Sequence, residues 1–219
     1  MNTVTNTNYQ TTFGMKQNLK TADIIQRKAK NTYAHISPYL FEQQENVMQN
    51  QKLKEFVLEL KRKLFDFRYI MQTSPNPQKL LIENLKRGNK LGNSGEEVDL
   101  ATIIGKINGQ KNIYSASVNG LDHAVSIITN KIVKNGQKQI MKNKDAIIID
   151  PQLGITDYAG NYFAKLKEIM GKPYQNATKN EAGLAVIPRN NHRLNKAQIA
   201  DLKTNYPELL IADYKHVKV

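Results

Sequence analysis

The spacing of apolar residues predicts that the first half of the chain is helical. The clearest helix covers residues 51–72, where six apolar side chains recur at helical intervals: Leu53, Phe56, Val57, Leu60, Leu64 and Phe67. Shorter helices are expected at about residues 21–30 and 77–87, with Gly88 in a C-cap position. Residues 1–20 are rich in Asn, Thr and Gln and show no clear period, so we expect a mobile N-terminal arm.

After about residue 110 the pattern changes to short β-rich segments. These are "NIYSASV", "DHAVSIIT", "KIVK", "KQIMK" and "DAIIID", and the dipeptides Asn119-Gly120 and Asn135-Gly136 between them indicate hairpins of an antiparallel meander. Helical patterns return in "NYFAKLKEIM" and "NKAQIADLKTNYPELL", and "EAGLAVIP" adds a candidate strand. Such segregated runs predict an α+β fold. We divide the chain into three parts: the N-terminal arm at 1–20, a helical segment at 21–75 that is a candidate recognition region, and a core at 76–219.

The net charge of +13 bears on the choice of partner. Such an excess is found in proteins that bind nucleic acid, anionic membranes or acidic proteins. Only 6 of the 32 basic residues are Arg, and the lysines are scattered, which disfavours nucleic acid and leaves an anionic membrane surface as a candidate partner. No apolar run is long enough to span a bilayer and no cleaved signal peptide is recognisable, so we expect a cytosolic protein, with secretion into a host or target cell as the alternative.

The chain contains no cysteine, which excludes disulfides and thiolate metal sites. His35, His192 and His216 have no partner at a metal-ligand spacing. We therefore expect no metal and no cofactor.

The segment "LGNSGEEVDL" predicts a capped helix. Ser94 and Glu97 have the S-x-x-E spacing of a capping box, and an apolar stripe follows at Leu100, Ile103, Ile104 and Ile107. A side-chain oxygen at a helix N-terminus also lies where a nucleophile would be stabilised as an anion. Ser94 therefore has a structural and a functional interpretation.

Two further residues complete a candidate catalytic set. His123 stands at the start of one predicted strand and Asp150 at the end of the last, directly before Pro151. Nucleophile, imidazole base and orienting carboxylate are the parts of a catalytic triad. Structural interpretations compete: Ser94 as a helix cap, His123 as a half-buried strand residue, and Asp150 as an Asx-turn. The three residues in this order favour the triad.

Three motifs carry a resemblance to a known family. "GNSGE" before an amphipathic helix, then "LDHAVSII", then "AIIIDPQ" resemble the papain-like domains of bacterial effectors and polymorphic toxins over roughly residues 80–165. Those domains carry G-N-C-G-E, D-H-x-F/V and D-P-W. This chain departs at Gln152, where the family has Trp, and at Ser94, where it has the nucleophilic cysteine.

The resemblance implies a helical lobe that carries the nucleophile at a helix N-terminus and packs on an antiparallel sheet carrying His and Asp. Residue 94, as cysteine, would be the nucleophile, His123 the general acid and base, and Asp150 the orienting residue. The backbone NH of residue 94 would form half of an oxyanion hole, and Asn89 or Asn93 would supply the second donor. The implied activity is cysteine-protease-type acyl transfer on a protein substrate, such as a host protein.

Alternatives stay open at this point. A glutamine deamidase or a transglutaminase would use the same triad, and a catalytically dead protein-binding module or a basic nucleic-acid-binding protein would not use it. Ser94 is consistent with a replaced cysteine, a native pseudoenzyme or a working serine nucleophile. We favour a replaced cysteine, which would leave this form inactive.

Overall fold

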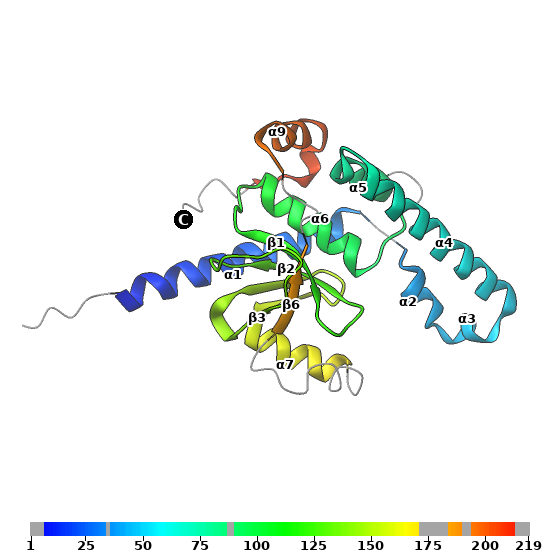
Figure 1. Cartoon of the computed structure of the whole chain (residues 1–219), viewed down its shortest axis with the longest axis horizontal. Coiled ribbons are helices and arrows are strands. Elements are labelled where there is room, and N and C mark those ends of the chain that lie inside the picture. Colours follow the sequence, from blue (N-terminus) through cyan, green and yellow to red (C-terminus); the bar gives the residue numbers. More distant parts are fainter. Residues whose placement is uncertain (1–6, 34–35, 87–89, 171–183, 190–193, 213–219) are drawn as a thin grey trace, which may run out of the picture.

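A six-stranded antiparallel sheet with helices on both faces forms the body of the protein (Figure 1). The computed structural model describes residues 7–33, 36–86, 90–170, 184–189 and 194–212. Every strand pair in the sheet is antiparallel, and the helices occur mostly before and after the strand-rich middle of the chain. The predicted α+β class is confirmed.

The helices agree with the sequence prediction in most places. They are α1 (Thr7–Thr32), α2 (Pro38–Glu42), α3 (Glu45–Gln49), α4 (Gln51–Thr73), α5 (Pro77–Lys86), α6 (Ser94–Ile107), α7 (Ala159–Met170) and α9 (Lys196–Asn205), with short 3₁₀ turns at Asn143–Asp145 and Pro207–Leu209. The helices expected at 51–72 and 77–87 are confirmed, while the predicted C-cap Gly88 lies outside the described residues.

The first helix is much longer than expected. Helix α1 begins at Thr7 and so includes residues 7–20 of the predicted N-terminal arm. An apolar stripe marks only the part of a helix that packs against other elements. In α1 that part contains the buried Ala22, Ile25 and Ala29, and the sequence pattern located it correctly. Residues 7–20 are therefore helical, and the expected mobility of the N-terminal segment stays a prediction.

The sheet has a more complex order than a meander. Its strands are β1 (Ile113–Val118), β2 (Ala124–Ile128), β3 (Gln139–Met141), β4 (Ile147–Asp150), β5 (Ile155–Tyr158) and β6 (Leu184–Pro188), arranged β3-β6-β1-β2-β4-β5. Strand β6 lies between β3 and β1, since its Val186 pairs with Gln139 on one side and Val118 on the other. Strand β5 was not predicted, and the predicted strand "KIVK" (131–134) is not a strand.

The two faces of the sheet contact different helices. Ile147 and Ile149 of β4 belong to the cluster that includes α1, α5 and α6, whereas Ile148 belongs to the cluster that includes α7. This alternation follows from the two-residue period of a strand. Helix α6 is buried along nearly its whole length, with only Gly95 and Lys106 left partly exposed. The start of α6 is therefore held rigidly against the sheet.

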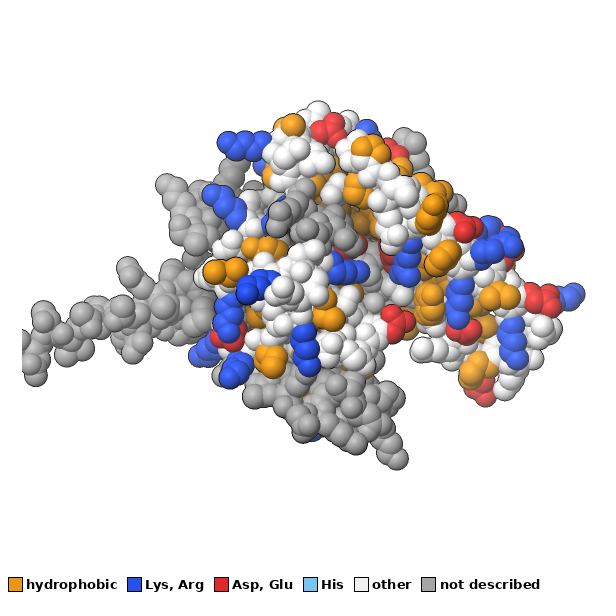
Figure 2. All heavy atoms as spheres, in the orientation of Figure 1, with side chains coloured by type: hydrophobic (Ala, Val, Ile, Leu, Met, Phe, Trp, Pro, Cys, Tyr) orange, Lys and Arg blue, Asp and Glu red, His pale blue; other side chains and the backbone are white. Residues whose placement is uncertain are grey.

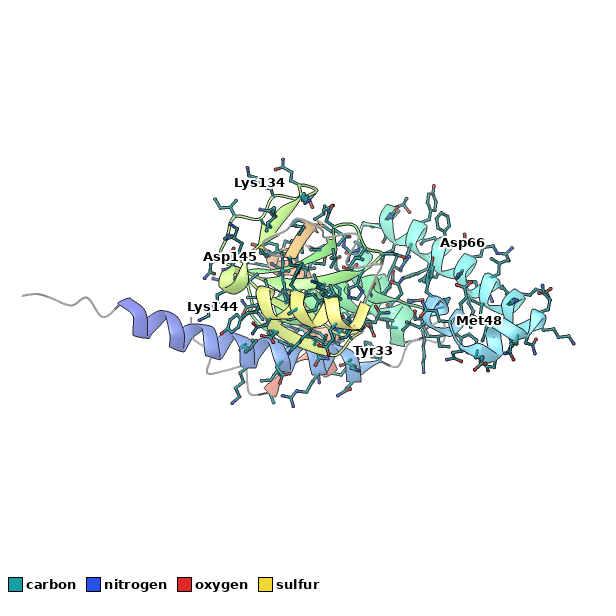
Figure 3. All side chains as sticks on the ribbon, turned by 90° about the horizontal axis from the view of Figure 1, so that it is seen from below. Tyr33, Met48, Asp66, Lys134, Lys144 and Asp145 are labelled. Atoms are coloured by element: carbon teal, nitrogen blue, oxygen red, sulfur yellow. The ribbon has the colours of Figure 1, made fainter. Side chains whose placement is uncertain are left out.

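Helices α2, α3 and α4 form an arm beside the sheet body in both ribbon views (Figures 1 and 3). In Figure 3 the labels Met48 and Asp66 mark this arm. Val47 of α3 and Val57 of α4 are buried between these helices. The part of α1 after residue 20 instead packs in the same core as α6. The role of residues 21–75 in recognition stays a prediction. No helix in the described part of the chain has both the length and the apolar character needed to cross a bilayer.

Candidate functional site

A pocket of about 240 Å³ lies where the end of α4, the start of α6 and the β1–β2 connection meet. Ser94 and His123 both line it, as do Arg68 from α4 and Arg189 from the segment after β6. In the space-filling view the surface is hollowed between the α4 arm and the sheet body (Figure 2). Two of the three residues singled out in the sequence thus face one cavity.

His123 and Asp150 form a buried hydrogen-bonded pair. The His123 Nε2 atom is 2.7 Å from Asp150 Oδ2, and the two residues are 6% and 0% exposed. Strand pairing explains the contact: Ser126 of β2 pairs with Ile149 of β4, which brings the start of β2 beside the end of β4. The backbone carbonyl of His123 also accepts a 2.8 Å hydrogen bond from the Val118 NH, which holds the backbone that carries the imidazole.

Asp150 has two further hydrogen bonds. The hydroxyl of Tyr162 donates to Oδ2 at 2.8 Å, and the backbone NH of Leu153 donates to Oδ1 at 3.0 Å. The Leu153 bond reaches three residues along the chain, one more than an Asx-turn spans, so Asp150 has a local backbone contact as well as its contact with His123. Its orienting role stays a prediction. Tyr162 was not singled out in the sequence, although it lies in the predicted helix "NYFAKLKEIM". Tyr162 is fully buried, and the hydroxyl of a buried tyrosine usually needs a hydrogen-bond partner. A tyrosine on the apolar side of a predicted helix was therefore the sequence feature that could have pointed to a buried polar partner.

The cap of α6 differs from the prediction. Asn93, not Ser94, is the N-cap: its Oδ1 accepts from the Gly95 NH at 3.0 Å, and its own NH donates to Glu96 Oε2 at 2.9 Å. The predicted Ser94–Glu97 box is therefore wrong by one residue. Asn and Ser are equally good caps and a glutamate follows each at the third position, so local preference does not separate the two registers.

An arginine from α4 stabilises the helix cap at Asn93. Arg68 donates from Nε to Glu96 Oε1 at 2.6 Å and from Nη2 to Glu96 Oε2 at 2.7 Å, and Nη2 is also 3.1 Å from Asn93 Oδ1. Burial acts to lower the pKa of Arg68, but the hydrogen bonds and charge of Glu96 outweigh it, and the pKa is raised. The guanidinium thus remains charged and joins the arm to the first turn of α6.

A second arginine meets the same turn from the sheet side. Arg189 donates from Nη2 to Asp99 Oδ1 at 3.1 Å. A Cβ atom at Gly95 would lie 3.7 Å from Arg189 Nη1 and 3.8 Å from Arg68 Nη2, so both guanidinium groups converge on the start of α6. Neither arginine was predicted from the sequence, because both act through contacts with residues far away in the chain.

The start of α6 leaves one backbone donor for a ligand. The NH groups of Gly95 and Glu97 donate to Asn93, whereas the Ser94 NH has no hydrogen-bond partner among the described residues. This NH is available for an oxyanion. The side-chain oxygen of Asn93 accepts the cap hydrogen bond, and its NH₂ group is the part that could serve as the second donor. Asn89 lies outside the described residues. Both assignments of a second donor stay predictions.

Ser94 is buried at 5% exposure and is the first residue of α6. It shares the pocket with His123, but no hydrogen bond joins these two side chains in the described part of the chain. Because Nε2 of His123 is bound to Asp150, Nδ1 is the ring nitrogen left to exchange a proton with residue 94. Within the described ranges there is no group of three or more His, Asp or Glu residues placed to hold a metal ion.

Comparison with known proteins gives no match: no protein-family model, no curated protein and no solved structure matches this chain.

Proposed function

We propose that this chain is a papain-like acyl-transfer domain of the cysteine-protease type that acts on an amide of a protein substrate. One observation carries the proposal: His123, which is hydrogen-bonded to the buried Asp150, lines the same pocket as Ser94, the first residue of α6. The motif resemblance in "GNSGE", "LDHAVSII" and "AIIIDPQ" supports it. Ser94 then occupies the position of the nucleophilic cysteine.

The residues suggest a specific sequence of proton transfers. With cysteine at position 94, His123 Nδ1 takes the thiol proton, and the thiolate attacks the substrate carbonyl carbon. The oxyanion that forms accepts a hydrogen bond from the NH of residue 94. His123 returns its proton to the leaving nitrogen, the C–N bond breaks, and an acyl-thioester forms. Water, activated by His123, then releases the acid and restores the thiol. Asp150 positions the imidazole throughout.

The choice between proteolysis and deamidation depends on whether the acyl group comes from the substrate backbone or from a glutamine side chain. In a transglutaminase an amine replaces water at the last step. All three reactions use the same residues of this chain. With Ser94 in place of cysteine, the alcohol is a poor nucleophile in a site suited to a thiolate, so we expect this form to bind substrate without turning it over.

Because the chain has no cysteine, the alkylation of a variant with one introduced cysteine measures the reactivity of that position alone. We would compare the Ser94→Cys and Ser117→Cys variants for their rates of alkylation by iodoacetamide across pH. Ser117 lines the same pocket from β1 but has no helix N-terminus behind it. The thiol at position 94 should have a pKa in the range of about 3.5–7.5, as reactive cysteines do, while that at 117 should titrate near ~8.5.

The comparison can contradict the proposal. Equal rates and equal midpoints for the two thiols would show that the start of α6 does not activate a nucleophile. The protein would then be a binding module with a structural serine. Thermal unfolding of both variants provides the control that each is folded.

A further inference from the structure

The arm carries most of the large hydrophobic side chains that are exposed in the part of the chain that the structure describes. Of the 13 large hydrophobic side chains that are exposed among the described residues, 9 lie between residues 36 and 70. Scattered exposed apolar residues are normal in proteins, but a concentration on one element marks an interaction surface. Figure 2 shows hydrophobic side chains gathered over α4 on the face that it displays.

Three of these side chains form a line along α4. Leu58, Phe65 and Tyr69 are 68%, 71% and 65% exposed, and they recur at i, i+7 and i+11 on one side of the helix. We call them the α4 stripe. The packing side of the same helix is formed by other residues, among them the buried Leu60 and Leu64. The α4 stripe is therefore a second apolar surface, turned away from the interior of the arm.

Cations accompany the α4 stripe. Lys54 and Arg62 lie one turn before and one turn after Leu58, and neither forms a salt bridge within the described part of the chain, although the charge of Arg62 helps to lower the pKa of Glu59. The three acidic residues of α4 are Glu55, Glu59 and Asp66. At 3.6 residues per turn they lie roughly a quarter-turn around the helix axis from the α4 stripe. The Lys61 ammonium lies 4.7 Å from the centre of the Tyr39 ring on α2 and also forms an ion pair with Glu42.

We propose that the α4 stripe docks onto an anionic lipid surface. A helix that lies in a membrane interface presents aromatic and aliphatic side chains bordered by Lys and Arg, which is the arrangement found here. The net charge of +13 attracts the whole chain to such a surface. The α4 stripe is a row on a convex helix, and a fluid lipid surface can adapt to it without a matching groove.

Docking of this kind would place the candidate site near the lipid surface. Arg68, Met71 and Gln72 line the Ser94–His123 pocket from the last turns of the same helix. The arm stands beside the sheet body in both ribbon views, so the body does not cover α4 from outside (Figures 1 and 3). This inference does not depend on the proposed acyl-transfer chemistry.

The test is sedimentation of the whole chain with vesicles of phosphatidylcholine and phosphatidylserine in a two-to-one ratio, beside vesicles of phosphatidylcholine alone. The variant with Leu58→Gln, Phe65→Gln and Tyr69→Gln removes the α4 stripe and keeps good helix formers. The matched control replaces the exposed residues Ile132, Ile140 and Ile169, all outside the arm, by Gln. Circular dichroism checks that both are folded, and Arg62→Glu is a single-residue variant if the triple variant unfolds.

We expect binding to the anionic vesicles, a loss of roughly tenfold or more in partitioning for the stripe variant, and little change for the control. Arg62→Glu should also weaken binding, and high salt should do the same. Absence of binding by the unaltered chain, or equal binding by stripe and control variants, would overturn the proposal. Self-association or binding of another protein that requires the α4 stripe, without vesicle binding, would overturn it too.

Discussion

Replacing Asp150 by alanine should destabilise the protein substantially. The side chain accepts hydrogen bonds from His123, Tyr162 and Leu153, and it is fully buried. Its removal leaves the buried donors of His123 and Tyr162 and the partly buried NH of Leu153 without their partner, and each such loss costs about 1–3 kcal/mol. We take the low end because the space vacated can admit water, which gives roughly 3 kcal/mol in the free energy of unfolding.

Asp150→Asn is the matched control, because it keeps the size of the side chain. Two of the three donors, from His123 and Tyr162, meet the same oxygen Oδ2, so the amide oxygen should take that place. The amide NH₂ then faces the Leu153 NH, and only that one hydrogen bond is lost, at about 1–3 kcal/mol. Urea unfolding followed by circular dichroism measures both variants. An Asp150→Ala protein within about 0.5 kcal/mol of the parent would refute this account of the network.

Three further predictions concern the scaffold. Asn93→Ala should cost about 0.5–2 kcal/mol as the loss of a cap, whereas Ser94→Ala should change the unfolding free energy much less, and equal losses would contradict the observed register. Gly105→Ala should destabilise by about 1–3 kcal/mol in urea unfolding, because its Cβ would lie 2.7 Å from a carbon of a buried isoleucine on β1. The ion pair with Lys86 lowers the pKa of Glu208, so its stabilisation is present at neutral pH and lost as the pH falls. Glu208→Gln should cost about 0.2–1 kcal/mol at pH 7; the difference from the parent should start to shrink at about pH 4.3, the pKa of a free glutamate, and vanish only below the lowered pKa of Glu208.

The local pattern of apolar residues was sufficient to locate the helices with a regular apolar repeat. The stripe of α6 and the packing side of α4 repeat at helical intervals, and both helices were located from that repeat alone. The start of α6 could not be predicted to the residue. Asn93–Glu96 and Ser94–Glu97 are equivalent capping boxes in sequence, and only the first can bind Arg68, which lies 25 residues before Asn93.

The sheet order and the surroundings of Asp150 depend on contacts between distant segments. Strand β6 inserts between β3 and β1 from a position more than forty residues later in the chain, which no local pattern reports. The motif order correctly brought His123 and Asp150 together, because the two residues mark the facing ends of paired strands. The Tyr162 hydroxyl reaches Asp150 from α7, and its role became visible only in three dimensions.

The most direct test of the central claim is the pH profile of alkylation in the Ser94→Cys variant with and without His123→Ala. The proposed site predicts that His123 stabilises the thiolate, so the variant with His123 should reach half-maximal rate below about pH 7.5. Removing the imidazole should move the midpoint towards ~8.5, the value of a free thiol, and slow alkylation at neutral pH. Identical profiles for the two proteins, each shown to be folded by circular dichroism, would contradict the assignment of His123 as the base.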